Sequence, residues 1–189
     1  RPEFLWSIKA VADTKETPFV SMSLNTVRRR YEDLKIQLPF AKVYYAVKAN
    51  PMDEVILLLK DLGSGFDAAS RYEIDGLLRL GVEPGRISFG NTIKKAKDIA
   101  YAYEKGIRVF ASDSYDDLHK IAENAPGARV FFRLITEGRG SDWPLSRKFG
   151  AHVDLIYSMI QDCPALGLEP FGLSFHVGSQ QRDVGQWDD

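Results

Sequence analysis

The chain has 189 residues, of which 44% are hydrophobic and 27% are charged, with a formal net charge of −1 at pH 7. This is ordinary globular composition, and the near-neutral charge gives no reason to expect a nucleic-acid or membrane partner. No apolar run is long enough to span a bilayer, and no secretory leader is visible. Cys163 is the only cysteine, which excludes an internal disulfide. Together these features predict a cytoplasmic protein.

The first predicted element is a strand at residues 19–24, followed by a helix at about 25–36 with Asn25 as its N-cap. From there a unit of short apolar strand, turn and amphipathic helix repeats. The predicted strands are 42–48, 65–69, 86–90, 108–112, 128–134 and 170–178. Most are continuous apolar runs, which are typical of strands covered on both faces.

The helices between these strands have readable starts. Asn50-Pro51 predicts a cap followed by proline at the first helical position. Ser70 and Glu73 have the spacing of a capping box, and Ser114 predicts the start of another helix. Further helices are predicted at 94–105 and 151–163. The connection 135–148 is long, and loops of this length are usually functional or mobile.

Strands that alternate with helices predict an α/β fold with a parallel sheet. The strand ends near 48, 67, 90, 112 and 133 are 19 to 23 residues apart, which favours a (β/α)₈ TIM barrel over an open doubly wound sheet. Six strands are visible where a closed barrel needs eight. We therefore expect a partial barrel over 39–189, preceded by a strand and helix over 1–38, within a fragment of a longer protein.

Lys48 ends the buried-looking run Val43-Tyr44-Tyr45-Ala46-Val47 and precedes Asn50-Pro51. An apolar wall around a lysine disfavours its ammonium form and frees its amine, which suits a Schiff base with a carbonyl cofactor. The alternative is a strand-end lysine that extends into solvent. Because parallel barrels place their sites at the C-terminal ends of strands, the neighbouring strand ends are the places to look for partners.

Two further strand ends carry charged residues, Asp67 and Arg133. Asp67 between apolar neighbours needs a partner such as Lys48 or an arginine, or it helps to cap the next helix. Arg133 needs an anion, which could be Asp67, a phosphate or a substrate carboxylate, and a plain salt bridge is the alternative. Glu73 is explained by the capping box and could also serve a ligand.

His176 ends the last predicted strand and precedes Val177-Gly178-Ser179. A histidine in an apolar strand is usually a satisfied core residue, but here Gly178 allows close approach of a ligand and Ser179 offers a hydroxyl to a phosphate. The imidazole could stack on a flat cofactor ring. No metal-ligand spacing is present. The run Lys94-Lys95-Ala96-Lys97 is interpreted as a solvated helix start.

Four stretches, taken in order, resemble the ornithine/lysine/diaminopimelate/arginine decarboxylase group of fold-type III enzymes. They are Tyr45-Ala46-Val47-Lys48-Ala49-Asn50-Pro51, Gly65-Phe66-Asp67-Ala68-Ala69-Ser70-Arg71-Tyr72-Glu73-Ile74, Arg147-Lys148-Phe149-Gly150-Ala151 and Ser174-Phe175-His176-Val177-Gly178-Ser179. Within the group the chain is most similar to bacterial ornithine/lysine decarboxylases. The resemblance implies an alanine-racemase-like barrel and pyridoxal 5′-phosphate, with the N-terminal strand joining a separate β-domain.

The resemblance also implies roles for individual residues. Lys48 would hold the cofactor covalently, with Asp67 near this lysine and Arg133 near the cofactor. His176 would stack on the pyridine ring, Ser179 would bind the phosphate, and Glu73 would belong to the cofactor's surroundings. The reaction implied is decarboxylation of ornithine or lysine to a diamine for polyamine biosynthesis, in a homodimer with shared sites.

Three rival interpretations stay open at this point. One is a decarboxylase or racemase that acts on another amino acid. Another is a catalytically silent regulatory homologue of the antizyme-inhibitor kind, against which the joint presence of Lys48, Asp67, Arg133 and His176 argues. The third is a simple carrier of pyridoxal phosphate on a bare barrel, against which the predicted N-terminal strand argues.

Overall fold

The computed structural model describes residues 8–145 and 148–187, and the chain divides into two compact units, residues 1–41 and 42–189. In the first unit, residues 8–12 are helical and α2 spans Leu24–Gln37. The hydroxyl of Ser23 accepts a hydrogen bond from the Thr26 N–H at 3.3 Å, so Ser23 caps α2. The predicted cap at Asn25 is wrong, because Asn25 already lies inside the helix.

The predicted strand at 19–24 is not formed in the described structure. Leu24 is taken up by α2, and Val20 is 92% exposed, so the apolar side chains of this segment are not packed against a sheet. A strand that pairs within a separate β-domain, and the domain boundary at residue 38, stay predictions.

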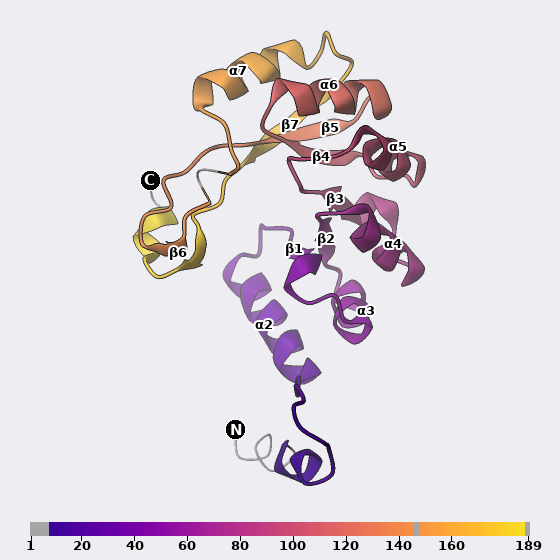
Figure 1. Ribbon diagram of the computed structural model, residues 1–189, viewed down its shortest axis with the longest axis vertical. Helices are drawn as coiled ribbons and strands as arrows, with labels where there is room; N and C mark the ends of the chain where they lie inside the picture. The colour runs from indigo at the N-terminus through magenta and orange to yellow at the C-terminus, as the bar shows by residue number, and fades with distance from the viewer. Residues whose placement is uncertain (1–7, 146–147, 188–189) are drawn as a thin grey trace. The chain divides into compact units, whose positions relative to one another are not determined.

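The second unit is built on a six-stranded parallel sheet whose order follows the chain, β1-β2-β3-β4-β5-β7 (Figure 1). Its strands are Tyr44–Ala46, Gly65–Ala68, Ile87–Phe89, Val109–Ser112, Arg129–Arg133 and Glu169–Ser174. All six predicted barrel strands are thus confirmed. Because each of these six strands pairs with the next of the six along the chain, the sheet has the order of a barrel and not that of a doubly wound sheet.

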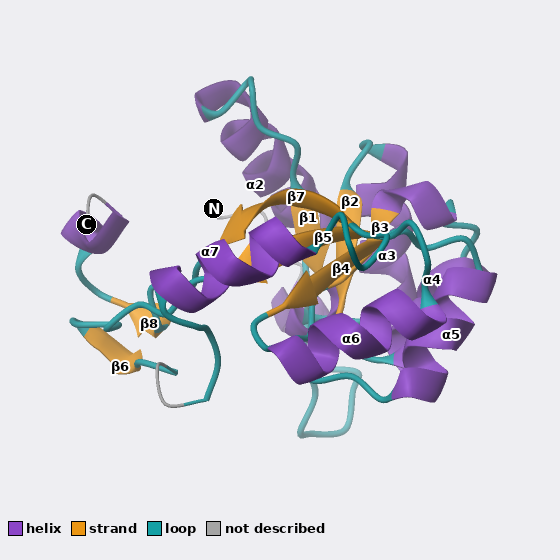
Figure 2. Ribbon diagram, turned by 90° about the horizontal axis from the view of Figure 1, so that it is seen from above, coloured by secondary structure: helices purple, strands orange, loops and turns teal. Residues whose placement is uncertain are grey.

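Helices join the successive strands and cover one side of the sheet (Figures 1 and 2). They are α3 (Asp53–Asp61), α4 (Arg71–Arg79), α5 (Ala96–Glu104), α6 (Tyr115–Asn124) and α7 (Val153–Asp162), with the 3₁₀ turns η1 (Val47–Ala49), η2 (Pro84–Arg86) and η3 (Val184–Trp187). Ser70 and Ser114 cap α4 and α6, as predicted. Asn50 does not cap α3, because Met52 holds that position, and the Asn50 side chain instead accepts from the Met52 N–H at 3.0 Å. No described helix has the length and apolar character needed to cross a membrane.

Strand residues alternate between the helix-covered face and the inner face of the sheet. Phe66, Ala68, Phe110 and Phe132 are fully buried and form the core with the apolar sides of the helices. The intervening residues face a hollow of about 610 Å³, which is lined by Lys42, Tyr44, Ala46, Asp67, Gly85, Ser88, Val109, Arg129, Phe131 and Phe171. In a closed barrel this interior is filled by layers of side chains from all the strands.

Two boundaries differ from the prediction near the end of the chain. The connection 135–148 contains β6 (Ser141–Trp143), which pairs antiparallel with β8 (Ser179–Gln181) in a separate two-stranded ribbon (Figure 2). Arg147, the first residue of the stretch 147–151 that resembles the decarboxylase group, lies outside the described residues. The last barrel strand ends at Ser174, so His176 lies in the connection between β7 and the ribbon.

Candidate functional site

Lys48 lies in η1, directly after β1, and its side chain is exposed. The prediction that an apolar wall encloses this lysine is wrong for the described structure. The strand ends at Ala46, and the following turn buries Val47 (3% exposed) in place of Lys48. Lys48 therefore presents its amine at the C-terminal edge of the sheet, two residues beyond Ala46, the residue that pairs with Asp67.

Asp67 lies on the inner face of β2, with its carboxylate turned toward β3. Its Oδ1 accepts a hydrogen bond from the Ser88 hydroxyl at 2.7 Å. Burial raises the pKa of Asp67, while the Ser88 hydrogen bond and the positive charge of Lys48 lower it and the charge of Glu73 raises it. Lys48 thus acts on Asp67 through its charge, and the predicted helix-capping alternative is excluded because Ser70 caps α4.

Arg133 is the last residue of β5 and is half-buried. Its guanidinium carbon lies 4.9 Å from the centre of the Phe149 ring. Burial lowers the pKa of Arg133, and the charge of Asp113 opposes this effect. The carboxylate whose charge acts on Arg133 is that of Asp113, which also accepts from the Gly150 N–H at 2.8 Å, whereas Asp67 was one of the three anions considered for it.

His176 is half-buried, and its Nδ1 accepts a hydrogen bond from the Gly178 N–H at 2.9 Å. A neutral imidazole with an accepting Nδ1 carries its proton on Nε2. Burial lowers the pKa of His176, and the charges of Arg133 and Lys48 lower it further. The ring is therefore mostly uncharged at neutral pH, with its proton on Nε2.

Gly178 and Ser179 join His176 to the ribbon. Gly178 has φ of +99°, and a Cβ at this position would lie 2.1 Å from the Ser141 hydroxyl oxygen. The glycine is thus needed for the approach of β6, whereas sequence reasoning assigned it to the approach of a ligand. Ser179 is the first residue of β8 and pairs with Trp143.

Glu73 forms the predicted capping interaction at the start of α4. Its backbone N–H donates to the Ser70 hydroxyl at 3.3 Å, and its Oε2 accepts from the Ala69 N–H at 2.7 Å. The side chain is half-buried, and its negative charge raises the pKa of Asp67. A role toward a ligand stays a prediction.

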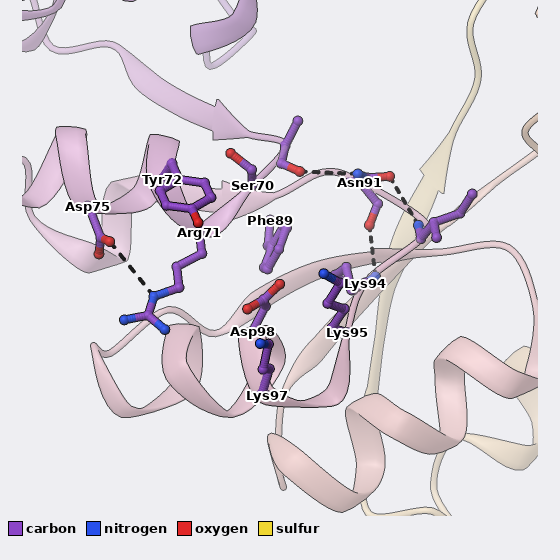
Figure 3. A pocket seen from close by; sticks show the side chains of 12 residues that line it. Ser70, Arg71, Tyr72, Asp75, Phe89, Asn91, Lys94, Lys95, Lys97 and Asp98 are labelled. Carbon is purple, nitrogen blue, oxygen red and sulfur yellow. Dashed lines mark hydrogen bonds and ion pairs between the residues drawn. The ribbon is translucent and has the colours of Figure 1, made fainter.

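A second set of contacts, which sequence reasoning missed, braces the strand ends next to the site (Figure 3). Asn91 donates from its side-chain amide to the Ala69 carbonyl at 3.1 Å, and its own carbonyl accepts from Lys94 Nζ at 2.8 Å. Lys94 also donates to the Ala111 carbonyl at 2.6 Å and to Asp117 at 2.6 Å. These bonds tie together the regions that follow β2, β3 and β4.

The same region borders a cavity of about 600 Å³ between α4 and α5 (Figure 3). Its lining includes Arg71, Asp75, Lys95 and Lys97, and none of the six predicted site residues. Arg71 is paired with Asp75 at 3.8 Å. The cavity lies outside the sheet and is separate from the predicted site.

Charge interactions thus link five of the six predicted site residues in the structure. The charge of Lys48 acts on Asp67 and His176, that of Arg133 acts on His176, and that of Glu73 acts on Asp67. Ser179 follows three residues after His176. An accessible amine, a nearby carboxylate, a cation at a strand end and a flat neutral ring form a set that fits a carbonyl-bearing, anionic, planar cofactor.

Comparison with known proteins identifies a cofactor of this kind. Residues 24–189 match the family described as pyridoxal-dependent decarboxylase, pyridoxal binding domain. The chain is 39% identical over 168 residues to ornithine decarboxylase of Neurospora crassa, covering 89% of this chain and 35% of the relative. It is 35% identical to the lysine/ornithine decarboxylase of Selenomonas ruminantium (96% and 46%) and 36% identical to antizyme inhibitor 2 of Xenopus laevis (93% and 39%). The chain therefore spans less than half the length of these relatives.

Solved structures agree with the sequence comparisons. The arginine decarboxylase of Paramecium bursaria Chlorella virus superposes with a TM-score of 0.91 at 29% identity, over 98% of this chain and 50% of that one. The lysine decarboxylase of Selenomonas ruminantium gives a TM-score of 0.88 at 35% identity, over 96% and 48%. The likeness of this chain to these two barrels shows that its parallel sheet belongs to the same fold. The chain belongs to the family of pyridoxal-dependent decarboxylases, whose pyridoxal-binding domain its residues 24–189 match.

Proposed function

We propose that this chain supplies the cofactor-holding side of an enzyme that decarboxylates a basic L-amino acid, ornithine or lysine, to a diamine. The observation that carries the proposal is the accessible Lys48 amine directly after β1, whose charge acts on the half-buried carboxylate of Asp67. The relatives named for ornithine and lysine decarboxylation support the substrate class. We further propose that the intact protein is a cytoplasmic homodimer that serves polyamine biosynthesis.

Pyridoxal 5′-phosphate, when bound, supplies a carbonyl for covalent attachment and a ring that takes up electrons released on loss of CO₂. Lys48 is the residue that holds it, because a primary amine is the group that condenses with a carbonyl. Asp67 places a negative charge near this amine. Ser179 offers a hydroxyl to the phosphate, and Glu73 borders the site from the first turn of α4.

His176 and Arg133 complete the site from the side of the sheet formed by β5 and β7. The imidazole of His176 gives a flat, uncharged face, and its Nδ1 is occupied by the Gly178 N–H, so that the ring is held in one orientation. Arg133 supplies a positive charge that attracts a carboxylate or phosphate. Its stacking on Phe149 holds the guanidinium in place.

The experiment that tests the proposal measures CO₂ release from L-ornithine and from L-lysine by the intact protein with pyridoxal 5′-phosphate. Lys48→Ala is compared with Lys42→Ala, which removes an exposed lysine at the opposite end of β1. Lys48→Ala should abolish the visible absorbance of the attached cofactor and most CO₂ release, whereas Lys42→Ala should retain both. Cofactor attachment without CO₂ from either amino acid would leave another substrate or a racemase as the better function.

A regulatory homologue is the second candidate function, favoured by the 36% identity to antizyme inhibitor 2 of Xenopus laevis. The two candidates differ at Lys48, since a silent regulator has no need of cofactor attachment. If the wild-type intact protein shows no absorbance of attached cofactor, the enzyme proposal is wrong and the regulatory one is favoured.

A further inference from the structure

Asp67 and Ser88 face each other across neighbouring strands. They are register partners in the parallel pairing of β2 with β3, so both side chains point to the inner face of the sheet. The Ser88 hydroxyl oxygen lies 2.7 Å from Asp67 Oδ1, and Ser88 is only 6% exposed. A buried hydroxyl at this distance from a carboxylate donates its proton to it, because an ionised carboxylate can only accept.

Gly90 lies two residues after Ser88 and therefore on the same face of the sheet. A Cβ at position 90 would lie 2.0 Å from Asp67 Oδ1 and 2.4 Å from Oδ2. Both distances are far below contact distance, so the Asp67 carboxylate occupies the space that any other residue at 90 would need. By contrast, a Cβ at Gly76 or Gly172 would meet nothing within 4 Å.

We propose that Ser88 and Gly90 are positioning residues that together fix the carboxylate of Asp67 next to Lys48. Ser88 holds one carboxylate oxygen by a hydrogen bond, and Gly90 leaves the space into which the carboxylate turns. The inference rests on the proposed function, in which Lys48 holds the cofactor, and it assigns roles to two uncharged residues, Ser88 in β3 and Gly90 directly after it.

The arrangement has a consequence for the charge at the site. Lys48, Glu73 and Ser88 are the described groups that act on Asp67, and burial is the largest influence on it. Ser88 stabilises the ionised carboxylate against burial and against the like charge of Glu73. Without this hydrogen bond, Asp67 keeps its proton to higher pH, and the negative charge beside Lys48 is lost over that range.

The first test needs no cofactor. The carboxyl carbon of Asp67 is titrated by NMR in the intact protein, with Ser88→Ala, Ser88→Thr and the control Ser64→Ala. Ser64 is also buried, and among the described residues its hydroxyl bonds to the carbonyls of Val43 and Gly65 and not to Asp67. The titration midpoint should rise in Ser88→Ala and stay at the wild-type value in Ser88→Thr and Ser64→Ala. An unchanged midpoint in Ser88→Ala would overturn the inference.

Gly90→Ala tests the same carboxylate from its other side. The added methyl group should displace the carboxylate from Ser88 and raise the midpoint in the same direction as Ser88→Ala. Thermal unfolding of each variant shows whether it is folded, and either Ser88→Ala or Gly90→Ala alone still tests the inference should the other fail to fold. A wild-type midpoint in folded Gly90→Ala would show that the carboxylate does not depend on this space.

The second test uses the cofactor-loaded intact protein. In Ser88→Ala, the pH midpoint at which the absorbance of attached cofactor changes should rise. The value of kcat/KM should fall about tenfold, and Ser88→Thr should restore both quantities. If the wild type attaches no cofactor, the proposed function fails, while the NMR titration still decides the role of Ser88. If the wild type attaches cofactor and Ser88→Ala keeps its pH dependence, the inference alone fails.

Discussion

Lys94 and Asp117 form an ion pair of 2.6 Å in which the two side chains are 0% and 3% exposed. The lysine comes from the end of the β3–α5 connection and the aspartate from α6. The ammonium group also donates to the carbonyls of Asn91 and Ala111, so its three protons are all used. Because Asn91 in turn bonds to the Ala69 carbonyl, this buried pair is connected to the end of β2, which carries Asp67 and whose following Ala69 N–H donates to Glu73.

Removal of one partner of this pair should strongly destabilise the fold. Lys94→Met leaves the Asp117 carboxylate buried without its cation, and such a change costs about 3–5 kcal/mol in the free energy of unfolding. The double variant Lys94→Met/Asp117→Leu should recover most of this loss, because it removes both buried charges. Urea denaturation of the intact protein measures these effects.

An exposed ion pair of the same unit serves as the control for this prediction. Arg79 and Asp53 lie 2.7 Å apart, with side chains 62% and 46% exposed. Arg79→Met should leave the denaturation midpoint nearly unchanged, since solvent screens exposed pairs. If Lys94→Met and Arg79→Met had equal effects, the buried pair would not brace the strand ends.

The six barrel strands could be predicted from the sequence because parallel strands covered on both faces are continuous apolar runs. The charged site residues Lys48, Asp67 and Arg133 were detectable for a related reason, since a charge at the end of such a run needs an explanation. The order of the strands followed from the regular spacing of the units, without any long connection that would reverse it.

The parts that could not be predicted depend on partners that are distant in the sequence. Lys94 was interpreted as solvated, and its partner Asp117 lies 23 residues away on another helix. Ser88 bonds to Asp67 across 21 residues, and a serine in an apolar strand carries no charge to mark it. The ribbon of β6 and β8 was missed because its strands have three residues each and lie on either side of α7.

Cys163 should react slowly in the folded protein. Burial raises the pKa of its thiol to about 11, and the charge of Asp162 adds to this effect. Since the native state holds the proton more tightly than the unfolded chain, the associated stability is present below pH 9 and is lost as the pH rises toward 11. Reaction with a thiol reagent at pH 8 should be slow until guanidinium is added. Equal rates in folded and denatured protein would show that the thiol is accessible.

Gly178→Ala should destabilise the ribbon that follows His176. The substitution combines a φ of +99° with a Cβ 2.1 Å from the Ser141 hydroxyl oxygen, whereas Gly63 has φ of +89° with nothing within 4 Å. Gly63→Ala therefore measures the backbone strain alone, about 1–2 kcal/mol. Gly178→Ala should cost more than this and should increase hydrogen exchange of the Ser141 and Gln181 amides. Equal losses of unfolding free energy in the two variants would mean that β6 shifts to accommodate the added methyl group at little cost.

Arg133 should keep the neighbouring imidazole of His176 uncharged. Burial and the charges of Arg133 and Lys48 place the pKa of His176 below its ordinary value of 6.5. Because the folded state binds this proton less tightly than the unfolded chain, the stability contribution is present above pH 6.5 and is lost as the pH falls through the folded-state pKa. Arg133→Gln removes one of the positive charges and should therefore raise the pKa of His176.

An NMR titration of the His176 ring in the intact protein without cofactor measures this change. Arg129→Gln is the matched control, because Arg129 lies at the other end of β5 and its guanidinium faces the Phe171 ring at 4.7 Å. The midpoint should rise in Arg133→Gln and stay at the wild-type value in Arg129→Gln. Equal midpoints in all three proteins would show that burial and Lys48 alone hold the imidazole neutral, and that Arg133 acts only on the ligand.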